Sequence, residues 1–305
     1  MSRFGQQFLP EVEVRGYVTA FVDLLGLSNK LLQLDALCDP QNHANAKQII
    51  GRSLAPVRTM RRAFEDFYRS FESHRDPVME EQVHNLPLPL QQLWNETHTY
   101  ESVVHWFSDC VSVSVPISEN SDLTTMRGIF SMFSSLSVVY LQMLAMHQAI
   151  RGGVEVGYGV EITQGEVIGS SLAKAYRVEQ VARYPRICIG GELLGMVEHY
   201  ARQDTSEPPE VLCKFFACSS KECLMTDLDG AVCINPLNTR FLKALDRNTR
   251  ARIIYNAFVF VHQEVRTARD SQNQSLLKKY EWLRDSFARI DLESCMQAAS
   301  KDLSD

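Results

Sequence analysis

Two aspartates lie within apolar segments whose composition is typical of β-strands. Asp23 lies in segment 17–27 and Asp109 in segment 103–115, and both segments are rich in valine and aromatic residues. Aspartate is uncommon in strands, and a buried carboxylate either has a cationic partner or takes up a proton. Either residue alone is equally well explained as a cap at a strand end. Together, on adjacent strands, they predict a site for a hard divalent cation.

The composition of the chain is that of an ordinary globular protein. Of its residues, 45% are hydrophobic and 22% are charged. The length of 305 residues allows one large domain or two smaller ones. The net charge of −6 gives no support for nucleic acid as a partner. It leaves a nucleoside triphosphate open, because a bound metal would neutralise the phosphates locally.

Cysteine usage and the apolar segments predict where the protein works. None of the eight cysteines forms a C-x-x-C pair, which argues against a structural zinc site. The first residues lack the apolar core of a signal peptide, so we expect a cytoplasmic protein. Segment 128–150 has no charged residue and could cross a bilayer by length. Its serines, glutamines and histidine would be costly in lipid, so we expect a buried helix and no membrane.

The expected elements favour an α+β fold, a sheet with helices packed on one face. Strands are expected over the segments rich in β-branched and aromatic residues, at 14–23, 103–108, 110–115, 153–160 and 185–189, with a hairpin at 224–234. Helices are expected at 27–38, at 44–72 with a kink or break at Pro56, at 128–150, from about 169 to 181, at 190–200 and from 239 onward. The polar segments 74–90 and 204–209 are expected to be a loop and a linker.

Four motifs in order give the chain a resemblance to a known family. They are FVDLLG at 21–26, FSDCV at 107–111, RGGVEVGYGVEITQGEVIG at 151–169 and LAKAYRVEQVARYPRICIG at 172–190. This pattern resembles the catalytic domain of class III nucleotidyl cyclases, and more closely the bacterial pyrimidine cyclases of the Pycsar antiphage system. The resemblance implies a class III cyclase-like sheet with packed helices in a catalytic domain at 1–235. Residues 236–305 are then a helical C-terminal extension packed on that domain.

The resemblance also implies how a nucleotide is held. Asp23, Asp109 and the carbonyl of Leu24 would bind the metal, with two Mn²⁺ ions per site and Mg²⁺ as the alternative. The turn through Leu25 and Gly26 would present N–H groups to the phosphates at the start of a helix. Phe21 would flank the nucleotide and, together with Leu25 and Gly26, would bind the substrate.

The resemblance also implies a candidate catalytic residue and an oligomeric state. Arg177 matches the arginine that stabilises the transition state; the alternative is a solvated or ion-paired helix residue. The resemblance implies a head-to-tail homodimer with the active site in the groove between the subunits. A separate effector that responds to the cyclic nucleotide would complete the system.

Two positions depart from the purine cyclases. Ala173 replaces the asparagine of the wider motif, and Glu166 stands where the adenine-selecting aspartate is found. These changes favour a pyrimidine substrate, UTP giving cyclic UMP, over an ordinary adenylate cyclase. The alternatives are CTP as the substrate and a catalytically silent, nucleotide-binding dimer.

Two further polar residues are expected to have structural roles. Arg186, in the Tyr-Pro-Arg-Ile segment, is expected to tie its strand to the preceding helix through Glu179 rather than to contact substrate. His105, next to Trp106 on a strand, is expected to be packed rather than catalytic.

Overall fold

A mixed β-sheet forms the centre of the protein in a computed structural model, which describes residues 13–27, 46–68, 84–96, 102–163, 165–227, 229–238, 242 and 247–287. Over these residues the sheet has eight strands in the order β2-β3-β1-β4-β6-β8-β7, with β5 paired to β4. Strand β1 pairs antiparallel with β3 and β4, and β6 runs parallel to β4. The strands are β1 (Val14–Leu24), β2 (Val103–Phe107), β3 (Cys110–Pro116), β4 (Ile150–Thr163), β5 (Glu166–Gly169), β6 (Ile187–Ile189), β7 (Leu224–Thr226) and β8 (Val232–Ile234).

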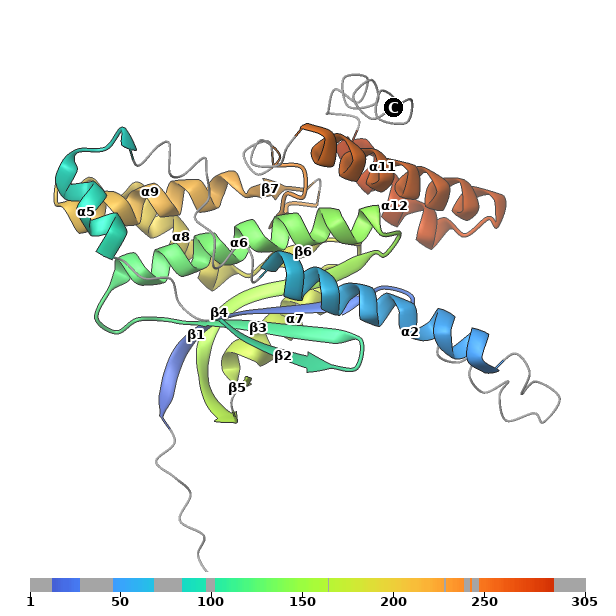
Figure 1. Cartoon of the computed structure of the whole chain (residues 1–305), viewed down its shortest axis with the longest axis horizontal. Helices are drawn as coiled ribbons and strands as arrows, with labels where there is room; N and C mark the ends of the chain where they lie inside the picture. Colours follow the sequence, from blue (N-terminus) through green and yellow to red (C-terminus); the bar gives the residue numbers. More distant parts are fainter. Residues whose placement is uncertain are drawn as a thin grey trace, which may run out of the picture.

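Most of the described helices cover one face of the sheet, which lies above it in Figure 1. The exception is α7, which packs on β4 and β1 from the opposite face. The helical elements are α2 (Ala46–Ala63), the π-helical turn η3 (Phe64–Tyr68), α5 (Leu88–Glu96), α6 (Asp122–Ala145), α7 (Ser170–Val181), α8 (Gly191–Arg202), α9 (Pro208–Glu222), α11 (Arg247–Asp270) and α12 (Gln274–Phe287). The α+β class is therefore confirmed, with one helix on the face expected to be bare.

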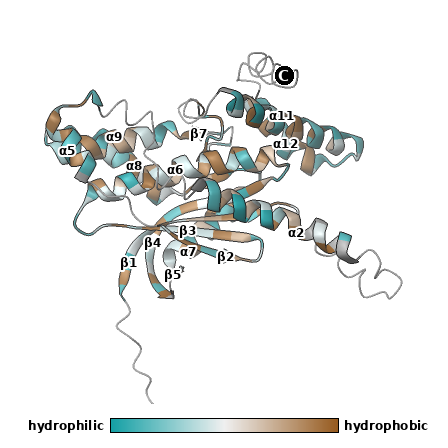
Figure 2. Ribbon diagram, in the orientation of Figure 1, coloured by the Kyte–Doolittle hydropathy of each residue, from teal (hydrophilic) through white to brown (hydrophobic). Residues whose placement is uncertain are grey.

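Helix α6, which has no charged residue from Gly128 onward, is the centre of the main core. Its first turn is capped by the Ser121 hydroxyl, which accepts from the Thr124 N–H at 3.2 Å. It is long and apolar enough to cross a membrane, yet 83% of its most apolar window is buried inside the protein. It packs over alternate residues of β1, such as Val18 and Val22, which are fully buried. Figure 2 shows hydrophobic residues along the strands and along the helix sides that face them.

The C-terminal helices α11 and α12 lie beside each other, and α11 packs on α6 (Figure 1). Ala257 and Val261 of α11 belong to the same buried cluster as α6 and β1. Burial of these side chains ties the C-terminal helices to the sheet layer by ordinary hydrophobic packing. The domain boundary after residue 235 stays a prediction.

Several expected elements differ in detail from the structure. Pro56 lies inside α2 without ending it. The expected loop 74–90 lies partly outside the described residues, and α5 begins within it at Leu88. The expected linker ends early because Pro208 opens helix α9, a helix that we did not predict, and proline suits a first helical turn. The expected helix 27–38 lies outside the described residues beyond Leu27.

Candidate functional site

The sheet brings Asp23 and Asp109 together at the end of β1. In the β1–β3 ladder Asp23 lies opposite Cys110, and the Leu24 N–H donates to the Asp109 carbonyl at 3.3 Å. Asp109 itself lies in the two-residue turn between β2 and β3, which Ser108 makes with a φ of +47°. One ligand atom from each of Asp23, Asp109 and Cys110 lies within 4.8 Å of the others, close enough to hold one metal ion.

Arg151 is the cation nearest to these carboxylates among the described residues. It lies opposite Asp23 on β4, with its Nη2 atom 3.7 Å from the Asp23 carboxylate. Its Nε atom pairs with Glu179 of α7, whose side chain is 1% exposed. Arg151 pairs with two carboxylates, those of Asp23 and Glu179, and Asp109 adds a third carboxylate beside Asp23, so the cluster keeps an excess of negative charge. Burial raises the pKa of Asp23, and the neighbouring carboxylates of Asp109 and Glu179 raise it further. A divalent cation would offset this excess charge.

The thiol of Cys110 adds a second kind of donor to the two carboxylates of the cluster. Burial and the adjacent Asp23 carboxylate raise its pKa far above the ordinary value, so the thiol is protonated at neutral pH. Its Sγ donates to the Asp23 Oδ1 atom at 3.3 Å. The ionised donors are therefore carboxylate oxygens, which suit Mg²⁺ and Mn²⁺ rather than a thiophilic metal. The residues present fit the hard cation that the sequence predicts.

The turn after β1 offers one backbone amide to a ligand. The Leu25 N–H, which we expected to face the phosphates, donates instead to the Ala149 carbonyl at 3.0 Å. Gly26 is exposed with a φ of +79°, and a Cβ built on it meets open space. Its N–H has no acceptor among the described residues. Leu24 as a carbonyl ligand stays a prediction.

Phe21 of β1 contacts helix α7, whereas Arg177, which belongs to α7, faces away from the sheet. The Phe21 ring packs edge-on against Tyr176 at a centroid distance of 5.4 Å. Ala175 and Glu179 form the buried side of α7, so Arg177, two residues from each, faces away from the sheet and is exposed. It makes no ion pair within the part of the chain that the structure describes. Arg177 is therefore not brought to the aspartates of its own chain.

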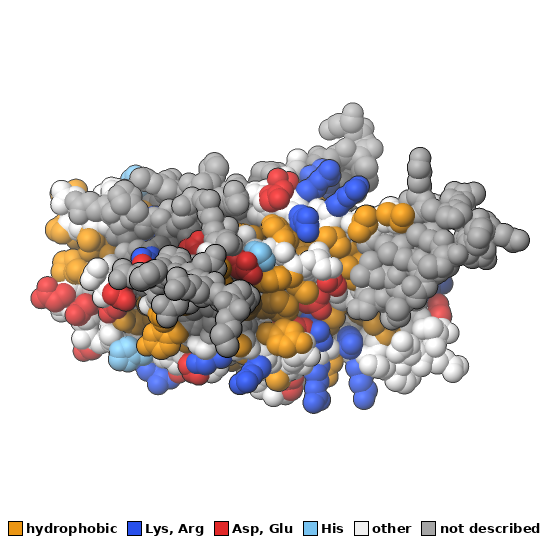
Figure 3. Space-filling model, turned by 90° about the horizontal axis from the view of Figure 1, so that it is seen from below, with side chains coloured by type: hydrophobic (Ala, Val, Ile, Leu, Met, Phe, Trp, Pro, Cys, Tyr) orange, Lys and Arg blue, Asp and Glu red, His pale blue; other side chains and the backbone are white. Residues whose placement is uncertain are grey.

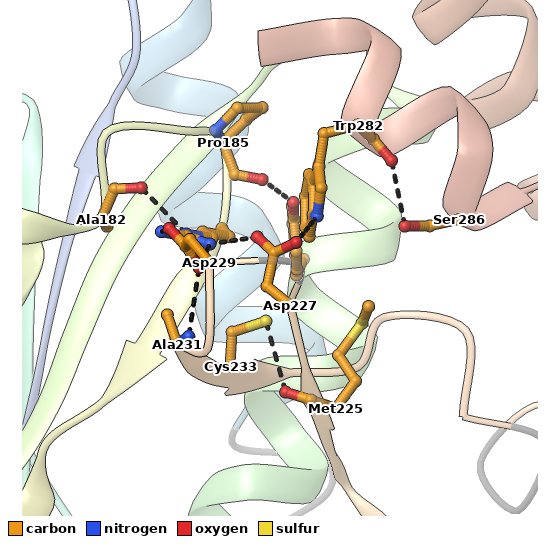
Figure 4. Close-up of polar contacts among 11 residues, drawn as sticks. Ala182, Pro185, Met225, Asp227, Asp229, Ala231, Cys233, Trp282 and Ser286 are labelled. Carbon is orange, nitrogen blue, oxygen red and sulfur yellow. Dashed lines mark hydrogen bonds and ion pairs between the residues drawn. The ribbon is translucent and has the colours of Figure 1, made fainter. Parts of the chain in front are cut away.

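Arg186 has the structural role that we expected, but with other partners. It is 1% exposed, donates to the Ala182 carbonyl at 2.9 Å and pairs with both Asp227 and Asp229. The predicted partner, Glu179, is wrong, because Glu179 pairs with Arg151 while Asp227 and Asp229 pair with Arg186. Figure 4 shows these two aspartates near Ala182 and Pro185. His105 packs against the Phe107 ring at 4.3 Å, as expected.

Sequence reasoning missed three members of the cluster: Arg151, Glu179 and Cys110. Arg151 is the second residue of β4 and directly precedes Gly152 and Gly153, the sequence signal that could have pointed to it. Gly153 lets α7 approach closely, since a Cβ on it would lie 2.3 Å from the Ala175 carbonyl oxygen. This close approach is what carries Glu179 to Arg151.

Comparisons with known proteins give distant similarities only. No protein-family profile and no curated protein sequence matches the chain. The catalytic core of a rhodopsin-guanylyl cyclase with converted specificity, in complex with ATPalphaS, is similar with a TM-score of 0.35 and 9% identity over 73% of this chain and 98% of that chain. A bacterial light-regulated adenylyl cyclase gives a TM-score of 0.33 and 12% identity over 91% of this chain and 58% of that chain. A second structure of a bacterial light-regulated adenylyl cyclase gives a TM-score of 0.33 and 11% identity over 69% of this chain and 59% of that chain. At this distance these similarities assign no activity.

Proposed function

We propose that the protein is a nucleotidyl cyclase that converts UTP to 3′,5′-cyclic UMP and pyrophosphate. The observation that carries the proposal is the cluster of Asp23, Asp109 and Cys110, whose ligand atoms lie within 4.8 Å of one another beside a glycine turn. Two carboxylates near a free backbone amide form the kind of site that holds a metal and a polyphosphate together. The order of the four cyclase-like motifs supports the same reaction.

The reaction is an intramolecular displacement. The ribose 3′-hydroxyl releases its proton to solvent and its oxygen forms a bond to the α-phosphorus. The bond from that phosphorus to the bridging oxygen breaks, and pyrophosphate leaves with the electron pair. Mn²⁺, or Mg²⁺ in its place, at two ions per site would lower the pKa of the 3′-hydroxyl and neutralise phosphate charge. Asp23 and Asp109 hold the cation, and the exposed Gly26 amide faces the polyphosphate. Arg177 stabilises the charge that builds on the α-phosphate oxygens.

The active protein in this proposal is a homodimer with shared sites. Arg177 faces away from the aspartates of its own chain, so it can reach such a site only on a second copy. Two large apolar side chains of the same helix, on the lower side of the sheet, are exposed: Tyr176 by 48% and Val181 by 68%. Figure 3 shows hydrophobic side chains gathered on this lower face. An exposed apolar surface of this kind is typical of a subunit interface.

The pyrimidine preference comes from the residues that differ from purine cyclases. Glu166 lies half-buried at the start of β5, and Ala173 is exposed on α7, four residues before Arg177. UTP is favoured over CTP by the resemblance to uridylate cyclases. The same resemblance supports a role in antiphage defence, in which cyclic UMP activates a separate effector.

The test is turnover of ATP, GTP, CTP and UTP, each supplied separately with Mn²⁺, by wild type and by the Asp23→Asn and Asp109→Asn variants. We expect cyclic UMP from wild type and at least a hundredfold loss in both variants. Co-purified mixed dimers of Asp23→Asn and Arg177→Ala chains test the shared site, because one of their two sites is intact. We expect these mixed dimers to recover activity, whereas either variant alone stays inactive.

A silent, nucleotide-binding dimer is the second candidate, and Ala173 is the observation that favours it. This reading requires metal-dependent binding of UTP with no product from any of the four triphosphates. A cyclic product from wild type that disappears in Asp109→Asn excludes it.

A further inference from the structure

A cavity of about 540 Å³ lies where β1 ends, between the sheet and the C-terminal helices. The Leu25–Gly26 turn forms one wall, and the 147–149 loop before β4 forms another. The remaining walls come from Pro185 and from α11 and α12. Since Gly26 is three residues from Asp23, their Cα atoms are at most ~11 Å apart. The cavity therefore adjoins the proposed metal site.

Lys279 of α12 is the lysine that lines this cavity. It is half-buried and makes no ion pair or hydrogen bond with the described part of the chain. A partly buried ammonium group without a partner is costly, and a bound anion would satisfy it. The neighbouring Lys278 is exposed. One lysine of the pair is thus directed to the cavity and the other to solvent.

A buried polar network fixes α12 over the cavity. The Trp282 indole N–H donates to Asp227, and Asp227 also pairs with the buried Arg186. The Tyr140 hydroxyl of α6 donates to the carbonyl of Pro185, a cavity residue. Figure 4 shows Trp282, Asp227 and Pro185 side by side between the helices and the β7–β8 hairpin. Satisfied buried networks of this kind hold the elements that they join in one arrangement.

His147 and Glu264 are the other ionisable side chains of the cavity besides Tyr280. His147 has a φ of +62° and its ring stacks on Phe260 at 5.4 Å, which fixes it at the loop before β4. Glu264 is hydrogen-bonded to Tyr280, and burial together with this bond raises the pKa of the Tyr280 hydroxyl. The Glu264 carboxylate opposes an anion in the cavity, while Lys279 attracts one.

We propose that this cavity holds the β- and γ-phosphates of the nucleotide and the pyrophosphate that leaves, with Lys279 as their cationic contact. The inference rests on the proposed function and extends it, since it makes the C-terminal helices part of the substrate site. Gly26, whose N–H has no acceptor among the described residues, lines the cavity on the turn after β1, and Lys279 lines it on α12. A charged contact of this kind is commonly responsible for about a tenfold difference in affinity.

The test is calorimetric titration of the full-length protein with inorganic pyrophosphate at fixed Mg²⁺. We expect Lys279→Ala to weaken pyrophosphate binding about tenfold, Lys279→Arg to restore it to within about threefold, and the matched control Lys278→Ala to bind like wild type. Glu264→Gln removes the opposing charge and should tighten binding. Inhibition by the cyclic product, which lacks these phosphates, should be the same in all variants.

Equal pyrophosphate affinity in wild type and Lys279→Ala, with the melting temperature unchanged, would overturn the inference while leaving cyclase activity intact. Equal losses in Lys279→Ala and Lys278→Ala would overturn it too, because they would indicate a general charge effect. Failure of the proposed function has a different signature: no cyclic product from wild type, although its pyrophosphate binding still depends on Lys279.

Discussion

Replacing Asp23 by asparagine should change stability in opposite directions with and without metal. In the metal-free protein the Asp23 carboxylate is half-buried, and the carboxylates of Asp109 and Glu179 act on it. Asparagine removes that charge, keeps an oxygen for the Cys110 thiol, and leaves Arg151 paired with Glu179. We therefore expect metal-free Asp23→Asn to melt at the same temperature as wild type or above it.

Bound metal should reverse the order of the melting temperatures of wild type and Asp23→Asn. At a Mn²⁺ concentration one hundred times the dissociation constant, binding to the folded state stabilises wild type by about 2.7 kcal/mol. Unfolding entropy of about 2.1 cal/mol/K per residue, multiplied by 305 residues, is ~0.64 kcal/mol/K. Dividing the stabilisation of about 2.7 kcal/mol by this entropy gives a rise of about 4 °C in the melting temperature of wild type. Asp23→Asn should show almost none of it.

Differential scanning calorimetry at neutral pH, with and without Mn²⁺, measures this crossing. Asp204→Asn, at an exposed loop carboxylate, is the matched control and should respond to Mn²⁺ like wild type. A lower melting temperature for metal-free Asp23→Asn would contradict our account of the electrostatics. A full Mn²⁺ shift in that variant would refute the metal site.

The same comparison predicts a pH dependence. The folded-state pKa of Asp23 lies above its ordinary value, chiefly because of burial. Its favourable contribution to stability is complete below the ordinary value and is lost as pH rises through the folded-state value. Lowering the pH from 7 toward 4 should therefore stabilise metal-free wild type relative to Asp23→Asn. It should also weaken Mn²⁺ binding to wild type, because protons compete for the carboxylate.

Three further substitutions test the catalytic and packing arguments. Arg177→Ala should lower kcat by about 10²–10³-fold, measured by steady-state kinetics, with no change in melting temperature because the side chain is exposed. Gly153→Ala places a Cβ against the backbone of α7 and should cost about 1–3 kcal/mol of unfolding free energy in urea. The control Gly51→Ala, in open space on α2, should stabilise by about 0.5–1 kcal/mol. Trp282→Phe removes the donor to buried Asp227 and should cost about 1.5 kcal/mol, also measured in urea.

The local patterns of the sequence predicted most strands because their side chains alternate or are continuously apolar. The strand at 14–23 and the hairpin around Gly230, whose φ is +82°, are examples. Helix α9 was missed because two prolines and acidic residues at its start suggested a linker. The side of the sheet taken by α7 was also missed, since only the close approach at Gly153 determines it.

The two aspartates could be found in the sequence because a carboxylate is conspicuous in a strand. Their environment could not, because it depends on cross-strand register: Arg151 and Cys110 are neighbours of Asp23 only through β4 and β3. The engaged amide of Leu25 likewise depends on a distant carbonyl, that of Ala149. Arg186 was correctly predicted to be structural, but its partners lie more than forty residues away.

The most direct test of the central claim is a competition assay with all four nucleoside triphosphates at equal concentration, Mn²⁺ and purified wild-type protein. Mass spectrometry of the products reports the ratios of kcat/KM in one tube. We predict cyclic UMP as the main product, with one pyrophosphate released per cyclic nucleotide, and none from Asp109→Asn. Release of nucleoside monophosphate or diphosphate without a cyclic product, or a cyclic purine as the main product, would contradict it.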